Sequence, residues 1–524
     1  MIKAIKIFIA CWAIVAMQGA SAQTAATRPA PTEKILGMYM HQHWSYKHPY
    51  AVRTWTLEDW RGYLDGLHRL GYNYILIWPM LEIMPDPLTP SDEANLAKIA
   101  KVIDMAHQDY NMRVSIVFCP NVSPKSEEGR KYTFEDRPFF HTDDRVDPGD
   151  PVAFGKLMEW REKLFKPLAQ ADGLFVIDSD PGGYPHSTNM EFVYILGAHR
   201  RMLDRLRPGI EINYWAHFGW ESYGNFYATG ELVKRGPEEI REAMQLLAKQ
   251  HYGPWGVANS GFDDNFADPI GMQDKVLAFP YGAIEYEPAF PLTVYGGDRA
   301  SGGGRRGGKR GVLGNAQSHV VQLPNTFAFA RGAQGKSVEK ADYTAFANEL
   351  IPGAGKQIVE GWEALQGEDA LRMRKAAKQL SAMQKSALQG GPLKGLMFGD
   401  PAGFVRDLAL QLNMAASLYE LKAVVDGNKN AAAKKKALAV FVDAASAWQG
   451  QHGYSNSWHW PQMESTLRKL NAAPINAALD THTWTSEEGA TAFDRVKNGL
   501  ARMESFTPRL LAAMRQALAE MNGK

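Results

Sequence analysis

Short runs of apolar residues alternate with amphipathic stretches between Ile35 and Arg331. Each run is rich in β-branched and aromatic residues and too short for a helix, which predicts a buried strand. The stretches between most of the runs have helical spacing, as in 57–70, where Trp60, Leu64 and Leu67 share one face. The strand candidates are 35–40, 74–78, 114–118, 174–177, 210–215, 255–259, 276–284 and 320–323.

Strands that alternate with helices predict a parallel sheet, and eight of them predict a (β/α)8 TIM barrel. A doubly wound open sheet is the alternative, but it usually carries a glycine-rich dinucleotide loop after its first strand. Here His41-Gln-His43 occupies that place. Beyond Arg331 helix formers dominate and no strand-like run remains, which predicts an α-helical C-terminal domain. We therefore expect a barrel over residues 23–334 and a helical domain over 335–524, with helices near 371–388, 406–425, 431–449 and 493–521.

The first 22 residues have the organisation of a signal peptide. Lys3 and Lys6 precede an apolar run, 7–17, which ends before Ala20-Ser-Ala22. The run is too short to span a bilayer, and no later segment is apolar enough to do so. We expect cleavage near Ala22 and a periplasmic or secreted protein without a membrane partner.

Composition narrows the function further. Loss of the leader removes Cys11 and leaves Cys119 as the single cysteine, so no internal disulfide can form. The formal charge of +1 gives no indication of a nucleic-acid partner. The oligomeric state stays open, with a homodimer among the options.

Two carboxylates directly follow the fourth predicted strand. Asp178 and Asp180 come after 174–177 and before Pro181-Gly-Gly183. Catalytic groups gather at the C-terminal ends of barrel strands, and residues two apart on a strand point the same way. The sequence therefore predicts two acids aimed at one cleft. The alternative is that one caps the next helix and the other is a solvated loop residue.

The other strand ends carry acidic, amide, imidazole and aromatic side chains. Amides and histidines can bind sugar hydroxyls, and tryptophan faces can pack on sugar rings. The candidate substrate-binding residues are His41, His43, Trp78, Asn121, Asn213, Trp215 and His217, and Glu82 and Asn325 also follow predicted strands. Glycoside hydrolysis needs one protonated carboxyl and one ionised carboxyl. Asp180 is the candidate acid, with Glu285 or Glu287 as its partner, while Asp178 positions substrate or tunes Asp180 by like-charge repulsion.

A glycine-rich segment, 302–311, interrupts the alternation and contains Arg305, Arg306, Lys309 and Arg310. Its composition predicts a mobile loop that cannot form a packed core. Folded over the barrel mouth, its cations would bind a uronate or a sulfate, because arginine binds such groups with two parallel hydrogen bonds. Otherwise it is a solvated loop.

Two patches carry a family resemblance. Asp178-Ser-Asp180 with Pro181-Gly-Gly183 resembles the D-S-E-x-x-P-G region of the α-glucuronidases that debranch xylan. Asn325-Thr-Phe-Ala-Phe-Ala-Arg331 resembles the N-x-Y-A-F-G-R stretch that closes their barrel. Those enzymes, and the related hexosaminidase-like barrels, also have a helical C-terminal domain. The resemblance, over residues 35–340, implies a glycoside hydrolase with Asp180 as general acid, although Asp replaces Glu and shortens the side chain by one methylene.

Two other functions remain open. A metal-dependent hydrolase would use His41-x-His43 with Asp178, but only His217 is well placed as a further histidine ligand, so we expect no metal and no cofactor. A non-catalytic glycan-binding barrel would hold sugar in the same cleft without cutting it. The leading prediction is an exported glycoside hydrolase acting on a polysaccharide or oligosaccharide, with uronic-acid-containing chains among its substrates.

Overall fold

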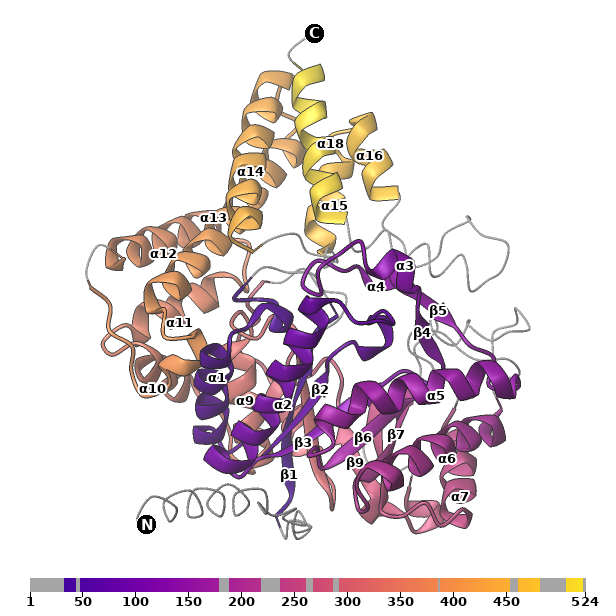
Figure 1. Cartoon of the computed structure of the whole chain (residues 1–524). Helices are drawn as coiled ribbons and strands as arrows, with labels where there is room; N and C mark the ends of the chain where they lie inside the picture. Colours follow the sequence, from indigo (N-terminus) through magenta and orange to yellow (C-terminus); the bar gives the residue numbers. More distant parts are fainter. Residues whose placement is uncertain are drawn as a thin grey trace, which may run out of the picture. The chain divides into compact units, whose positions relative to one another are not determined.

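A closed barrel of eight parallel strands forms the core of the protein (Figure 1). The computed structural model describes residues 33–43, 48–178, 188–217, 236–260, 267–285, 292–384, 387–452, 460–480 and 506–521. The barrel strands are β1 (Ile35–His41), β2 (Tyr74–Trp78), β3 (Arg113–Phe118), β6 (Gly173–Ile177), β7 (Glu211–His217), β8 (Trp255–Ser260), β9 (Val276–Phe279) and β10 (Gly311–Ala316). Each pairs with the next in this order, and β10 pairs with β1. The predicted (β/α)8 architecture is confirmed.

Helices follow most of the barrel strands. They are α1 (Leu57–Arg69), α2 (Pro90–Tyr110), α5 (Pro151–Phe165), α6 (Asn189–Leu206), α7 (Pro237–Lys249), α8 (Arg299–Arg305) and α9 (Leu323–Ala333). Short polar side chains start several of them: Thr56 and Thr89 each accept the backbone N–H three residues on, from Asp59 and Asp92. Each aspartate in turn accepts the N–H of its threonine, which completes a capping box.

Shorter elements lie between the main ones. The antiparallel strands β4 (Val122–Pro124) and β5 (Asp143–Arg145) pair between β3 and α5 and flank the one-turn helices α3 (Ser126–Gly129) and α4 (Phe139–Thr142). The 3-10 segments are Val52–Thr54, Leu81–Ile83, Lys166–Leu168, Asp268–Ile270, Gln273–Lys275 and Lys394–Met397.

The eighth strand differs from the prediction. Residues 320–323 are not a strand, since Leu323 already begins α9, and the barrel is closed by β10 instead. The sequence pattern did not predict β10 because it contains Gly311 and Gly314, and glycine weakens the apolar pattern of a strand. A Cβ on Gly311 would lie 2.1 Å from the Ile35 carbonyl oxygen, and one on Gly314 would lie 2.6 Å from Ile284 Cδ1. These glycines therefore permit close packing around β10.

The glycine-rich segment is not a mobile loop. It forms α8 and leads into β10, and its glycines bring α8 against neighbouring backbone. A Cβ on Gly303 would lie 2.4 Å from Ala283 Cβ, and one on Gly304 would lie 2.1 Å from the carbonyl oxygen of Phe329 in α9. The high glycine content of 302–311, which predicted a mobile loop, instead allows α8 to pack closely against Ala283 and α9.

The C-terminal part is helical, as predicted. Its helices, coloured salmon to yellow in Figure 1, are α10 (Lys340–Leu350), α11 (Gly355–Ala364), α12 (Ala370–Met383), α13 (Pro401–Asp426), α14 (Ala431–His452), α15 (Pro461–Arg468), α16 (Ala473–Asp480) and α18 (Phe506–Glu520). Contacts with the barrel include Gln411 of α13, whose Oε1 accepts the N–H and the hydroxyl of Thr293 at 2.9 and 3.0 Å. Residues 34–524 form one compact unit, so the boundary at 334 stays a prediction.

The predicted leader lies outside the described residues, and cleavage near Ala22 also stays a prediction. In the described part of the chain, no helix combines the length and the apolar character that crossing a bilayer requires.

Candidate active site

Aromatic side chains fill the barrel interior towards the C-terminal ends of its strands. Tyr39 of β1 contacts Trp215 of β7 and Phe279 of β9, with ring centroids 5.2 and 5.9 Å apart. Trp78 of β2 lies 5.3 Å from His41 and 6.4 Å from Trp215. Because β1 and β7 are not neighbours in the sheet, these rings meet across the interior. The structure thus brings together His41, Trp78 and Trp215, three of the predicted substrate-binding residues.

His41 and His43 stack on each other, with ring centroids 5.1 Å apart and an angle of 30° between the rings. Both side chains are buried, and burial lowers the pKa of each well below its usual value, with the charge of Arg53 adding to the effect. His41 Nδ1 accepts the backbone N–H of His43 at 3.3 Å, so the proton of neutral His41 lies on Nε2. Both imidazoles are therefore uncharged at neutral pH.

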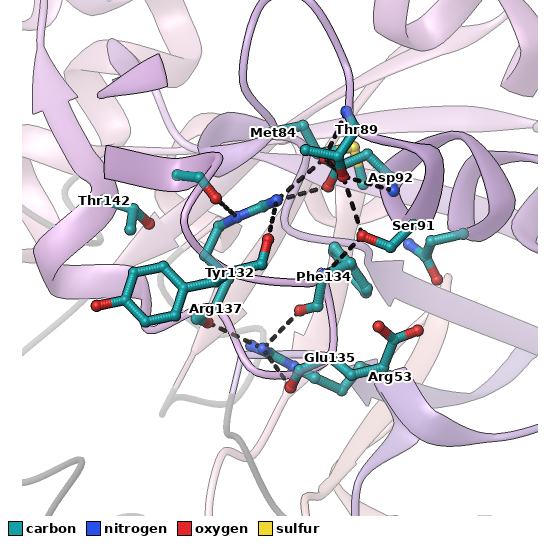
Figure 2. A network of polar contacts seen from close by, with 12 residues as sticks. Arg53, Met84, Thr89, Ser91, Asp92, Tyr132, Phe134, Glu135, Arg137 and Thr142 are labelled. Carbon is teal, nitrogen blue, oxygen red and sulfur yellow. Dashed lines mark hydrogen bonds and ion pairs between the residues drawn. The ribbon is translucent and has the colours of Figure 1, made fainter. Parts of the chain in front are cut away.

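A fully buried arginine holds the backbone of this histidine pair. Arg53 Nε donates to the Gln42 carbonyl at 2.7 Å, and Nη2 donates to the His43 carbonyl. The same guanidinium donates to the carbonyls of Phe134 and Arg137, both at 3.0 Å, and to that of Glu135 (Figure 2). Arg53 thereby ties the segment after β1 to the segment between α3 and α4.

Arg137 supports that second segment through a buried ion pair. Its Nη1 and Nη2 donate to the two oxygens of Asp92, at the start of α2, at 2.6 and 3.0 Å, and both side chains are fully buried (Figure 2). Such a two-bond pair fixes the loop geometry more tightly than a single contact. Sequence reasoning missed Arg53 and Arg137, because an arginine outside a strand end reads as a solvated residue.

Glu285 follows β9 and is 4% exposed. Its Oε2 accepts the backbone N–H groups of Gln317 and Ser318, which follow β10, at 2.6 and 2.7 Å. Burial raises the pKa of Glu285, and the two N–H bonds act in the opposite direction. A carboxyl held in this way has a defined orientation together with a raised proton affinity.

Glu82 is a second buried carboxyl near the strand ends. Cys119 N–H donates to its Oε1 at 2.6 Å, and Trp78 Nε1 lies 3.3 Å from both of its oxygens. Burial raises the pKa of Glu82, and the charge of Arg161 opposes that shift. The sequence placed Glu82 after a strand but assigned it no role.

Asp178 is fully buried on the helix side of the barrel wall. Its Oδ2 accepts the hydroxyl of Tyr214 at 2.9 Å, and the Tyr214 ring packs on Phe192 of α6 at 4.8 Å. Asp180 and Glu287 lie outside the described residues, as does the side chain of His217. The catalytic roles assigned to Asp178, Asp180, Glu285 and Glu287 stay predictions.

The remaining predicted residues lie outside the cluster of His41, Trp78 and Trp215. Asn121 Nδ2 donates to the Val146 carbonyl at 2.8 Å. The expected strand-end position of Asn213 is wrong, because β7 continues to His217 and Asn213 Oδ1 accepts Arg310 Nη1 at 3.1 Å in the lower barrel. Arg305 is exposed and pairs with Asp298, and Arg306 caps the same short helix, α8. Asn325 lies within α9, where its Nδ2 donates to the Ile284 carbonyl at 2.8 Å.

Several buried polar atoms around the barrel interior lack a hydrogen-bond partner in the described part of the protein. They include Trp215 Nε1, Asn315 Oδ1, His319 Nε2 and Gln42 Nε2. A buried group without a partner costs about 1–3 kcal/mol, so such groups indicate water or a ligand. Asn315 and His319 were missed with the eighth strand; the available signal was the run Gly311-Val-Leu-Gly-Asn-Ala316 followed by polar residues.

Among the residues that the structure describes, no three or more His, Cys, Asp or Glu side chains are grouped closely enough to hold a metal ion. His41 and His43 are paired with aromatic neighbours instead.

No family model and no curated protein matches the chain. Among solved structures it has distant similarity to glycoside hydrolases and to a sugar isomerase. CpGH84D is 11% identical, with 79% of this chain and 69% of that chain covered and a TM-score of 0.39. A GH5_18 variant from Streptomyces cattleya, solved in complex with Manb1-4GlcNAc, is 14% identical, with 57% and 80% covered and a TM-score of 0.35. A sugar phosphate isomerase/epimerase from Parabacteroides distasonis is 13% identical, with 59% and 97% covered and a TM-score of 0.32. At these scores the similarity carries no argument about function, and the barrel assignment rests on the strand pairing.

Proposed function

We propose that the protein is an exported glycoside hydrolase, periplasmic or secreted, that cleaves a polysaccharide or oligosaccharide with a pair of carboxylates. The observation that carries the proposal is Glu285, a buried and oriented carboxyl with a raised pKa. It adjoins the aromatic interior, because Gln317 Nε2 donates to the Tyr281 hydroxyl at 3.0 Å and the Tyr281 ring contacts Phe279. Strand-end carboxyls of a parallel barrel, beside aromatic side chains, suit the hydrolysis of sugars.

The two carboxylates have different roles in this proposal. Asp180 protonates the leaving oxygen, as the resemblance to α-glucuronidases implies, and Glu285 activates water or attacks the anomeric carbon. The raised pKa makes ionised Glu285 a stronger base than an exposed glutamate. Glu287 is the alternative within its pair. Asp178, bonded to Tyr214, fixes the end of β6, and Asp180 follows it two residues later in the sequence.

Sugar binding falls to the interior side chains. Trp78 and Trp215 are the aromatic rings proposed to pack on the sugar, and His41, whose ring lies 5.3 Å from that of Trp78, is the neutral imidazole beside them. The unpartnered Trp215 Nε1 and Asn315 Oδ1 supply a donor and an acceptor that hydroxyl groups can satisfy. His43, which stacks on His41, and His217 are further candidates from the predicted set.

Product analysis tests the proposal. The mature protein is incubated with a panel of neutral and uronic-acid oligosaccharides, and products are separated by chromatography. Glu285→Gln and Asp180→Asn should each reduce the rate at least 1,000-fold, while Glu238→Gln, an exposed change on α7, should leave it unaltered. Since folding raises the pKa of the base, the acidic limb of kcat/KM should lie above pH 4.5, the usual pKa of glutamate.

Two results would contradict this function. Full activity in Glu285→Gln would remove its carboxyl from the mechanism. Saccharide binding without any product, measured by calorimetry across the whole panel, would support a non-catalytic glycan-binding barrel.

A further inference from the structure

His319 lies directly after β10, in the turn that leads into α9. The C-terminal ends of barrel strands form the face at which substrates of such barrels bind. The side chain of His319 is fully buried, and its ring contacts those of Trp55 and Tyr63, with centroids 5.3 and 5.1 Å away. These contacts hold the imidazole in one orientation.

One of the two ring nitrogens of His319 has a partner. The hydroxyl of Tyr63, on α1, lies 3.0 Å from His319 Nδ1. Burial lowers the pKa of His319 to about 3, so the ring is neutral and carries a single proton. A buried phenol hydroxyl needs an acceptor for its own proton, and an unprotonated ring nitrogen is such an acceptor. Tyr63 therefore donates to Nδ1, and the proton of His319 lies on Nε2.

The second nitrogen, Nε2, is a buried donor that lacks a hydrogen-bond partner within the part of the chain that the structure describes. The two nitrogens of an imidazole point in diverging directions, so Nε2 points away from α1 while Nδ1 faces it. Burial of a donor without an acceptor is unfavourable, and such a group indicates a bound water or a ligand.

The surroundings of His319 place this donor beside the candidate active site. Ser318, the residue before it, donates its N–H to Glu285 Oε2 at 2.7 Å. Burial raises the pKa of Tyr63, and the charge of Glu285 raises it further. Burial likewise lowers the pKa of His41, and a charge on His319 lowers it further. His319 thus lies close both to the candidate catalytic carboxyl and to His41.

We propose that His319 is a further substrate-contacting residue, which donates from Nε2 to a hydroxyl or ether oxygen of the sugar unit bound beside Glu285, and that Tyr63 is its positioning residue. The proposal rests on the proposed hydrolase function. Asn315 complements this donor, because it pairs with Tyr39, whose ring lies in the barrel interior, and its Oδ1 is a buried acceptor without a partner in the described residues. A donor and an acceptor four positions apart can bind neighbouring hydroxyl groups of one sugar.

Two substitutions separate a contact with sugar from a role in packing. The side-chain oxygen of asparagine can take the place of Nδ1, and the longer amide of glutamine can reach the place of Nε2. His319→Asn should therefore keep an acceptor for Tyr63 but lose the donor to sugar, so saccharide affinity should fall about tenfold with little change in the melting temperature. His319→Gln should keep affinity within about threefold but lower the melting temperature more. A purely structural role predicts the opposite order.

Calorimetry on the full mature protein measures these affinities, with cellotriose, xylotriose, mannotriose and chitotriose as probes. The Asp180→Asn background limits turnover and leaves the bonds between Glu285 and the segment of His319 unaltered. His251→Asn, a change at an exposed histidine, is the matched control and should not alter the affinity.

Nuclear magnetic resonance of the histidine-labelled protein tests the positioning role of Tyr63 without any ligand. His319, assigned by comparison with His319→Asn, should be neutral and protonated on Nε2 down to about pH 5. Tyr63→Phe should remove this preference for one nitrogen, and it should weaken saccharide binding by a smaller factor than His319→Asn does.

Several results would overturn the proposal. They are a wild-type His319 protonated on Nδ1, unchanged affinity in His319→Asn (which would leave Nε2 bonded to water alone), a larger loss of affinity in His319→Gln than in His319→Asn, and no binding of any of the four probes. Product release with an unaltered KM in His319→Asn would likewise overturn the contact and leave the hydrolase function standing. Binding that depends on His319, with no product from the wild type, would instead contradict the hydrolase function and leave the contact standing.

Discussion

Asp407 offers a quantitative test of how a buried carboxyl shapes the stability of this protein. It lies on α13 with 5% of its surface exposed, and Gln411 Nε2 donates to its Oδ2 at 2.7 Å. Burial raises the pKa of Asp407 to about 6, although hydrogen bonds from Tyr50 and Gln411 oppose the shift. The usual value is 3.8. Its ionisation therefore costs more in the folded protein than in the unfolded chain.

The sign and size of the effect follow from linkage. Between pH 4 and pH 6 the unfolded chain loses this proton first, so the free energy of unfolding falls as the pH rises. A shift of about two pKa units corresponds to about 3 kcal/mol in full. Roughly 2 kcal/mol of that loss falls between pH 4 and pH 7. Asp407→Asn abolishes the titration but keeps the size of the side chain.

Urea unfolding at a series of pH values measures the effect. The difference in unfolding free energy between wild type and Asp407→Asn should move by roughly 2 kcal/mol in favour of the variant from pH 4 to pH 7. Any cost of the amide itself is the same at each pH and cancels. Asp443→Asn, at an exposed position of α14, controls for the loss of a carboxylate charge. A difference that stays constant over this range would refute the argument.

Three further substitutions test saccharide binding and the packing of the barrel. Trp215→Phe keeps an aromatic ring but removes the unpartnered Nε1–H, so saccharide affinity should fall about tenfold in calorimetry while the melting temperature changes little. Unchanged saccharide affinity, or a loss of affinity accompanied by a large fall in the melting temperature, would contradict a role of Nε1–H in binding. Gly304→Ala should lower stability in urea by more than 1 kcal/mol despite the better helix propensity of alanine, because its Cβ would lie 2.1 Å from the Phe329 carbonyl oxygen. Arg53→Gln should cost about 3 kcal/mol in urea and raise KM, since several buried carbonyls lose their donor; an unchanged KM would separate Arg53 from the sugar site.

Local patterning was sufficient for most of the architecture. Seven of the eight barrel strands lie where the apolar runs predicted them, and α1 begins at Leu57, where the predicted helix 57–70 begins. Burial on both faces makes such strands continuously apolar, which is visible in the sequence itself. The strand ends likewise indicated His41, Trp78 and Trp215, because barrel topology brings such positions together.

The missed eighth strand and the wrong assignment of 302–311 as a loop had one physical origin. Glycine in 302–311 and in β10 read as disorder or as a break, whereas Gly303, Gly304 and Gly311 serve close contacts with Ala283, Phe329 and Ile35. A glycine can give the chain conformational freedom, or it can allow two segments to approach closely. Which of these applies depends on the residue that packs against the glycine, and that residue is distant in the sequence. The consequence reached the site, because Asn315 lies in the strand that was missed, and Gln317 and His319 follow it.

The sequence by itself determined the alternation of strands and helices, the helical C-terminal part and the strand-end residues of β1 and β2, since these follow from periodicity along the chain. Only the tertiary structure decided that Glu285 is bonded to the segment after β10, that Asp178 faces Tyr214, and that Arg53 is satisfied by carbonyl groups. Each of these depends on contacts between residues ten or more positions apart. The pKa and the orientation of a polar group are set by its burial and by its hydrogen-bond partners. Both arise only when the chain has folded.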